Sequence, residues 1–172
     1  AREGNDQAIP LPVARMTHAD RNQRPPMATP AGFAGKMSGR TEFSFSGLKT
    51  AVKRIVVARR QEIGTDRLPD EDIRDICASF QRVVVETLLD RTFDAARWFG
   101  ARSVGIAGGV SANSRLRTEA GERGASTGLT VFLPSLALAT DNAAMIAAAG
   151  LRNLRAGVTA SLDLNAQASL DL

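Results

Sequence analysis

The stretch Ser103-Val104-Gly105-Ile106-Ala107-Gly108-Gly109-Val110-Ser111-Ala112-Asn113 decides the fold of this chain. Its apolar start predicts a short buried strand over 103–107, and the glycine pair predicts a tight turn that leads into a helix. This order brings backbone N–H groups at a helix N-terminus beside the carboxyl end of a strand, a frequent site for a phosphate or a nucleotide. A glycine pair alone is a weak signal, so the hypothesis depends on the rest of the chain.

The composition is that of a globular domain. Hydrophobic residues make up 44% and charged residues 23% of the 172 residues, enough for one core. No apolar run approaches the ~20 residues of a membrane-spanning helix, so no membrane association is expected. The single cysteine, Cys77, lies at helical spacing from Ile73, Ile76 and Phe80, which predicts a core position and a reducing, cytoplasmic location. The net charge of +4 suits an acidic partner such as RNA, but a merely solvated basic surface explains it at least as well.

Residues 1–42 are predicted to be a connector and insertion without long elements, because prolines and glycines interrupt them throughout. Their basic residues suit either a loop that faces RNA or a solvated loop, and the solvated loop is favoured. His18, the only histidine, is interpreted as a surface residue because no second histidine could join it as a metal ligand. Since the sequence starts at Ala1 and not at a methionine, we expect a fragment of a longer protein.

The central part of the chain predicts an initial strand and two helices. Phe43-Ser44-Phe45-Ser46 alternates with period two and predicts a short half-buried strand. Apolar residues from Leu48 onward share one helical face up to Gly64. Pro69, followed by three acidic residues, predicts the start of a helix that reaches Trp98, with Gly100 as its C-terminal cap. Such a helix would be long for a globular domain, so a kink near 87–92 is considered.

The chain after the glycine pair alternates helix and strand. Ser111 or Asn113 is expected to cap a helix over 114–123 that ends at Gly124. A strand follows over 129–133 and stops at Pro134. Thr140 is expected to cap an alanine-dense helix that carries Asp141 in its first turn, ends at Gly157 and packs closely on a sheet. The pattern predicts an α/β fold with a short parallel or mixed sheet of about three strands, packed by helices.

Two polar loops therefore follow consecutive strands, and the carboxyl ends of parallel strands meet at one edge of a sheet. Asp141 could bind a divalent metal or cap its helix, and capping is favoured. Asn113 could contact a ribose or phosphate, or it could cap the following helix, and the sequence favours the two roles equally. Lys49 could meet an anion, but a solvated lysine is the safer interpretation. The sequence lacks the motifs of P-loop NTPases, paired-histidine zinc proteases and cysteine–histidine enzymes.

Three motifs in order resemble one family. They are Phe43-Ser44-Phe45-Ser46-Gly47-Leu48-Lys49-Thr50-Ala51-Val52, Ala107-Gly108-Gly109-Val110-Ser111-Ala112-Asn113 and Thr140-Asp141-Asn142-Ala143-Ala144-Met145-Ile146-Ala147. This set is similar to the tRNA threonylcarbamoyladenosine transferases (TsaD or Gcp, formerly O-sialoglycoprotein endopeptidase). The resemblance implies the two-lobed actin and sugar-kinase (ASKHA) fold. Residues 43–157 would be its second, nucleotide-binding lobe and 158–172 a C-terminal tail, with the first lobe absent.

The resemblance also implies a reaction and a site. The enzyme would move a threonylcarbamoyl group from threonylcarbamoyl-AMP to N6 of the adenosine next to the anticodon in tRNAs that read ANN codons. Gly108 and Gly109 would line the adenylate pocket, Asn113 would contact the adenylate, and Asp141 would be a ligand of bound iron (Fe²⁺) or zinc. No catalytic residue is assigned. TsaB-like and TsaE-like proteins would be partners beside tRNA.

Two departures from the family pattern limit this implication. The other metal ligands of the family are two histidines of the first lobe, which His18 alone does not replace. The stretch from Val13 to Glu42 is also longer than the usual connector of the family. We therefore expect this chain alone to be inactive. The alternatives are a nucleotide-binding or scaffold half without its own catalysis and, less favoured, a metalloendopeptidase.

Overall fold

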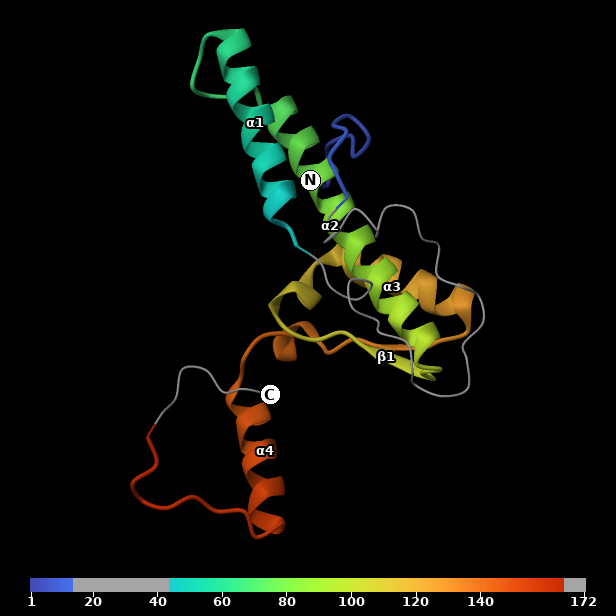
Figure 1. The fold of residues 1–172 in the computed structure, drawn as a ribbon, viewed down its shortest axis with the longest axis vertical. Coiled ribbons are helices and arrows are strands. Elements are labelled where there is room, and N and C mark those ends of the chain that lie inside the picture. Colours follow the sequence, from blue (N-terminus) through green and yellow to red (C-terminus); the bar gives the residue numbers. More distant parts are fainter. Residues whose placement is uncertain (14–43, 166–172) are drawn as a thin grey trace.

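The structure, a computed structural model, describes residues 1–13 and 44–165. The described part forms helices and two short strands (Figure 1), in the order α1 (Ser46–Ile63), α2 (Asp70–Trp98), β1 (Ser103–Gly105), α3 (Ser114–Thr127), β2 (Thr130–Phe132) and α4 (Ala143–Arg155). Single 3-10 turns, η2 (Gly109–Ala112) and η3 (Leu136–Leu138), follow the two strands. The predicted α/β class is confirmed, with two strands in the described part instead of about three.

β1 and β2 pair in parallel, with Val104 opposite Val131 and Gly105 opposite Phe132. Parallel neighbours need a crossover connection, and α3 supplies it. The N–H of Ile106 donates to the carbonyl oxygen of Phe132 at 3.0 Å, so the pairing continues one residue beyond β1. The alternation of strand and helix thus produces the parallel pairing that the sequence predicts.

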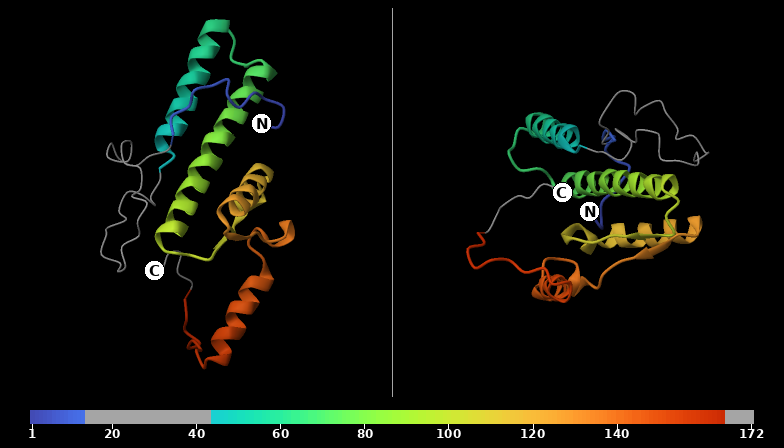
Figure 2. Two further views of the ribbon diagram at one scale, coloured as in Figure 1. Left: turned by 90° about the vertical axis from the view of Figure 1, so that its right-hand side faces the viewer. Right: turned by 60° about the horizontal axis from the view of Figure 1, so that its bottom comes forward.

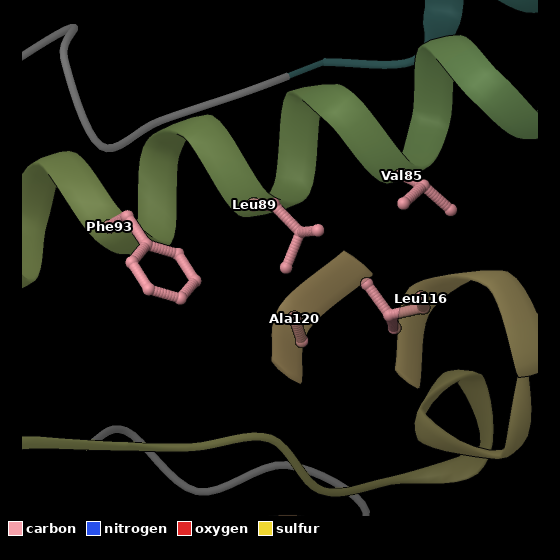
Figure 3. Packing of buried hydrophobic residues seen from close by; sticks show 5 residues of the cluster. All are labelled: Val85, Leu89, Phe93, Leu116 and Ala120. Carbon is pink, nitrogen blue, oxygen red and sulfur yellow. The ribbon is translucent and has the colours of Figure 1, made fainter. Parts of the chain in front are cut away.

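The main core lies where α2 and α3 pack on this sheet (Figures 2 and 3). Residues four positions apart on one face of α2 meet two residues of α3, and together the cluster comprises Val85, Leu89, Phe93, Leu116 and Ala120. Half-buried apolar side chains at and beside the two strands complete it: Ile106, Leu129 and Val131. Each large side chain buried here contributes about 1.5–3 kcal/mol, so this cluster holds the strands under the two helices.

α1 and α2 form a helical hairpin that extends away from the sheet (Figure 1). α1 ends at Gly64, as predicted. Leu48 of α1 and Val83 of α2 are buried together with Leu11 of the N-terminal segment. The apolar face predicted from Leu48 onward is therefore the face that α1 turns toward α2.

The N-terminal residues lie along α2. Residues 1–13 contain no helix or strand, in agreement with the prediction, but their backbone is fixed by side chains of the helix. The N–H of Ile9 donates to the hydroxyl of Ser79 at 3.2 Å, and Nε of Arg82 donates to the carbonyl oxygen of Asp6 at 2.9 Å. The side chain of Arg115 on α3 forms an ion pair with Asp6 at 2.7 Å. His18 and most of the predicted insertion lie outside the described residues.

The strand predicted over 43–46 is wrong for the residues that the structure describes. Phe43 lies outside them. Phe45 is the N-cap residue of α1, and its carbonyl oxygen accepts a hydrogen bond from the N–H of Lys49 at 2.9 Å. Phe45 also packs against the cluster that contains Leu48. Four alternating residues are too few to distinguish a strand from the apolar entry to a helix.

The boundaries of two helices also differ from the predictions. α2 is a single α-helix over its 29 residues, drawn without a break in Figure 2, so the kink considered near 87–92 is absent. Phe99 and not Gly100 is its C-cap, and Gly100 follows directly. α3 continues through Gly124 and ends at Gly128. Gly124 is a contact residue: an added Cβ would lie 2.5 Å from Cγ2 of Val131 and 2.9 Å from the carbonyl oxygen of Leu129.

The predictions for Cys77 and for the last helix are wrong as to burial. Cys77 is exposed, because the core face of α2 passes through Ile76 and Val83, about 100° around the helix from it. None of the α4 residues is buried, although the sequence predicted close packing on a sheet. Met145 and Ile146 are 51% and 68% exposed. Among the described residues, no helix is both long and apolar enough to cross a bilayer.

The Asp6–Arg115 ion pair predicts a pH-dependent stability. The hydrogen bond from Arg115 lowers the pKa of Asp6 below its usual value, so the pair stabilises the folded chain above the unfolded-state pKa and is lost as the pH falls through the lowered pKa. Because both side chains are partly exposed, Asp6→Asn should lower the free energy of unfolding by at most about 1 kcal/mol at pH 7. Urea unfolding should show the difference between wild type and variant shrinking as the pH is lowered from about 7 toward 2, because Asp6 becomes protonated in the folded chain. A difference that is equal at both pH values would contradict this account.

A second prediction concerns Gly124. Alanine is favoured over glycine within a helix by about 0.5–1 kcal/mol, but the contacts with Val131 and Leu129 should outweigh this gain and make Gly124→Ala destabilising by roughly 1–3 kcal/mol. Gly121 lies in the same helix, and nothing lies within 4 Å of its added Cβ. Gly121→Ala is therefore the matched control and should stabilise the chain. Urea unfolding that shows equal stabilisation by both variants would rule out the contact.

Candidate functional site

The candidate site consists of two loops that leave the carboxyl ends of the paired strands. The first loop (106–113) follows β1 and the second loop (133–142) follows β2. The strands are parallel, so both loops start at the same edge of the sheet. This is the convergence that the sequence predicts for the two polar motifs.

The first loop turns at the glycine pair. Gly108 has φ +86° and ψ 172°, a conformation open essentially to glycine. The carbonyl oxygen of Gly108 accepts the N–H of Ser111 at 2.9 Å, which closes the 3-10 turn η2. Gly108 and Gly109 are exposed, so their backbone is accessible to a ligand, as the adenylate hypothesis requires.

Asn113 is the N-cap of α3. Its Oδ1 accepts the N–H of Leu116 at 3.0 Å, which satisfies one of the free donors of the first turn. Of the two residues considered as caps, Asn113 and not Ser111 has this role. Within the described part of the chain, Nδ2 of Asn113 donates no hydrogen bond, so its amide group is still available for a ligand. The adenylate contact stays a prediction.

The second loop carries Asp141, in a position that differs from the prediction. Asn142 and not Thr140 is the N-cap of α4: its Oδ1 accepts the N–H of Met145 at 3.0 Å, and its Nδ2 donates to the carbonyl oxygen of Thr140 at 3.0 Å. Asp141 therefore precedes the helix and does not lie in its first turn. Asn142 takes the capping role because its side chain can serve the helix and the preceding carbonyl group at once. Asp141 is exposed, and in the described part no hydrogen bond or ion pair engages its carboxylate.

The two loops lie close to each other. An added Cβ on Gly109 would be 3.9 Å from Cγ2 of Thr140, so the glycine pair and the segment before Asp141 are neighbours. Arg117 of α3 links the loops through its guanidinium group. Nη1 donates to the carbonyl oxygen of Ser111 at 3.1 Å and Nη2 to that of Pro134 at 2.8 Å.

Sequence reasoning missed Arg117, although a signal was present. A cation in the first turns of a helix opposes the helix dipole by about 0.3–1 kcal/mol, and the sequence places Arg115 and Arg117 directly after the cap. Arg115 is compensated by acidic partners, Asp6 and Glu119. Arg117 instead donates to carbonyl oxygens, and such charge-assisted hydrogen bonds are worth about 1.5–3 kcal/mol each.

Ser111 is a second unusual residue of the first loop. It is fully buried, and its hydroxyl oxygen has no hydrogen-bond partner within the described residues. An unsatisfied buried hydroxyl costs about 1–3 kcal/mol. Its carbonyl oxygen is the one that Arg117 binds, so the buried position of Ser111 fixes where the loop meets the guanidinium group.

Within the described residues, Asp141 has no cluster of metal ligands around it, and Lys49 is not joined to either loop. No three His, Cys, Asp or Glu side chains are grouped as a metal site within residues 1–13 and 44–165. Asp141 offers one carboxylate, whereas protein sites for iron or zinc use several ligands. The described residues therefore do not form a metal site by themselves. Lys49 is exposed on α1, and no described hydrogen bond or ion pair joins it to either loop.

Comparison with known proteins identifies the family. A family model described as TsaD, tRNA N6-adenosine threonylcarbamoyltransferase, matches residues 7–148, a range that includes both loops. The chain belongs to this family. The resemblance carried by the three motifs is thus confirmed. The first loop holds the second motif, and the second loop holds the first three residues of the third motif, which continues into α4.

Curated relatives agree with this assignment. Proteins named tRNA N6-adenosine threonylcarbamoyltransferase from Symbiobacterium thermophilum and Koribacter versatilis are 42% and 37% identical over the whole chain, which covers 42% and 48% of their lengths. A protein of the same name from Syntrophotalea carbinolica is 45% identical over 131 residues, 76% of this chain and 37% of the relative. The chain therefore spans less than half the length of these TsaD relatives.

The cap geometry of Asn113 gives a direct prediction for the stability of this chain. Asn113→Ala removes the acceptor for the N–H of Leu116 and should lower the free energy of unfolding by about 1 kcal/mol. Asn113→Asp keeps a side-chain acceptor and should retain most of the stability. Urea unfolding of the three proteins measures this. Equal losses in both variants would mean that Oδ1 does not cap α3 in solution.

Proposed function

We propose that this chain is the C-terminal, nucleotide-binding lobe of an enzyme that modifies tRNA. The whole enzyme transfers a threonylcarbamoyl group from threonylcarbamoyl-AMP to N6 of the adenosine next to the anticodon in tRNAs that read ANN codons. One observation carries the proposal: the two loops with the family's motifs, far apart in the sequence, lie close together at one edge of the parallel strands and are bridged by Arg117. The ASKHA assignment of this lobe belongs to the same proposal.

The loops suggest a division of roles. Gly108 and Gly109 expose backbone on one wall of an adenylate pocket, where a side chain would obstruct the approach of a ligand. Asn113 presents its free Nδ2 as a donor to the ribose or phosphate. In the reaction, N6 of adenosine forms a bond to the carbamoyl carbon, the bond from that carbon to the phosphate oxygen breaks, AMP leaves, and N6 releases a proton.

Asp141 is proposed as one ligand of an iron or zinc ion, with the other ligands from the remainder of the protein. Its exposed carboxylate, without a partner in the described part, is consistent with that role. The relatives are more than twice as long as this chain, so there is room in a whole protein for further ligands. A cytoplasmic location, tRNA as substrate and TsaB-like and TsaE-like partners are part of the same proposal.

A nucleotide-binding or scaffold half without catalysis is the alternative that one observation favours, since the described residues do not group as a metal site. The two functions differ in their dependence on metal. Calorimetry with AMP, in the presence and absence of Fe²⁺, separates them: binding that is independent of metal, with no transfer by the whole protein, indicates a scaffold. The metalloendopeptidase alternative needs a general base beside a metal-bound water, and the described site offers only Asp141.

The decisive experiment measures threonylcarbamoyl transfer to a tRNA transcript, with threonylcarbamoyl-AMP as donor. The whole protein that carries these residues should form the modified nucleoside, whereas the 172-residue chain alone should not. Asn113→Asp in the whole protein should keep its thermal stability but weaken AMP binding roughly tenfold or more, since the new carboxylate repels the phosphate. Activity of the chain alone in a depletion strain would overturn the expected inactivity. Wild-type binding and transfer in Asn113→Asp would remove Asn113 from the site.

A further inference from the structure

We propose that Arg117 is a positioning residue that holds the first and second loops in one arrangement and thereby sets the geometry between the glycine pair and Asp141. This inference rests on the proposed function for its effect on substrate, but the link between the loops stands on the structure alone. Arg117 is not a catalytic residue, because it acts through main-chain carbonyl groups of the loops.

Arg117 binds one carbonyl group from each loop with a different nitrogen. Nη1 takes the carbonyl oxygen of Ser111 at 3.1 Å, and Nη2 takes that of Pro134 at 2.8 Å. These acceptors are 23 positions apart in the sequence, on either side of α3 and β2. Parallel pairing brings the strand ends together, but it does not fix the loops beyond them. The guanidinium group does this, since its nitrogens are held in one rigid plane.

The backbone of Arg117 is itself anchored beside the site. Its N–H donates to the carbonyl oxygen of Asn113 at 3.1 Å, so the residue belongs to the turn that Asn113 caps. The side chain is half-buried, and the buried Ser111 holds the acceptor of Nη1 in place. The cap, the glycine turn and the second loop are therefore joined through one side chain.

The short distance between Gly109 and Thr140 shows what this link controls. An added Cβ on Gly109 would lie 3.9 Å from Cγ2 of Thr140, and Asp141 is the next residue. If the guanidinium contacts are lost, the second loop is held at this edge by the buried Ala139 and by the end of β2. We expect Asp141 to move relative to the glycine pair, and small displacements of positioning groups can cost up to about 100-fold in rate.

The experiment uses the whole protein that carries these residues and compares three variants. Arg117→Ala removes both hydrogen bonds. Arg117→Lys keeps the charge but has a single donor nitrogen, which cannot reproduce the planar two-nitrogen contact. Arg115→Ala is the matched control: it removes an arginine two residues away whose partners, Asp6 and Glu119, lie outside both loops.

Amide hydrogen exchange tests the link without any substrate. Arg117→Ala and, more weakly, Arg117→Lys should increase exchange in segments 109–113 and 136–142 together, by roughly tenfold in the alanine variant. Arg115→Ala should leave both segments as in the wild type. Unchanged exchange in the loops of the Arg117 variants, or an equal increase in the Arg115 variant, would overturn the proposal.

Calorimetry with AMP and transfer to a tRNA transcript test the consequence for the site. Arg117→Ala should lower kcat for transfer and AMP affinity by about 10- to 100-fold, with an intermediate loss in Arg117→Lys, while Arg115→Ala keeps both even if its Tm falls equally. If Arg117→Ala shows faster hydrogen exchange in the loops but wild-type AMP affinity and transfer, the positioning role is overturned. If the wild-type protein neither binds AMP nor transfers, the proposed function fails, and hydrogen exchange alone then decides whether Arg117 links the loops.

Discussion

The parallel pairing of β1 with β2 is the constraint on which the rest of the structure depends. Parallel neighbours cannot be joined by a tight turn, so α3 must cross from one strand to the next and pack on the pair. α2 then covers α3 and β1, and the cluster around Leu89 and Phe93 forms between them. The same pairing sends both polar loops to one edge of the sheet, and a site is therefore built from segments remote in sequence.

α3 performs several functions in this arrangement, and each depends on a different residue. Asn113 begins the helix, Leu116 and Ala120 bury it against α2, and Gly124 lets its last turns approach Val131. Arg117 has a different role, because its side chain binds the two loops and not the core. The helix that makes the parallel sheet possible is thus also the element that holds the candidate site together.

The family and the class of fold followed from the sequence because they depend on local order. Motif order, the change from alternating to helical apolar spacing and the glycine positions are all readable along the chain. The resemblance was confirmed by the family model and the relatives, and α1, α2 and the β1–α3–β2 unit were found where the pattern placed them. The errors at Phe45 and Gly124 arose where a short pattern suits two local structures and packing selects one.

What the sequence by itself determined was therefore the elements, their order and the family. Only the tertiary structure decided which polar residue caps α3 and α4, that Cys77 faces outward and α4 lies unburied, and that Arg117 joins two loops. The link by Arg117 depends on a contact between residues distant in the sequence, Arg117 with Pro134, and apolar periodicity carries no record of any of these outcomes. The physical reason is that one hydrogen-bond donor can serve several nearby acceptors, and the packed fold alone fixes which acceptor is within reach.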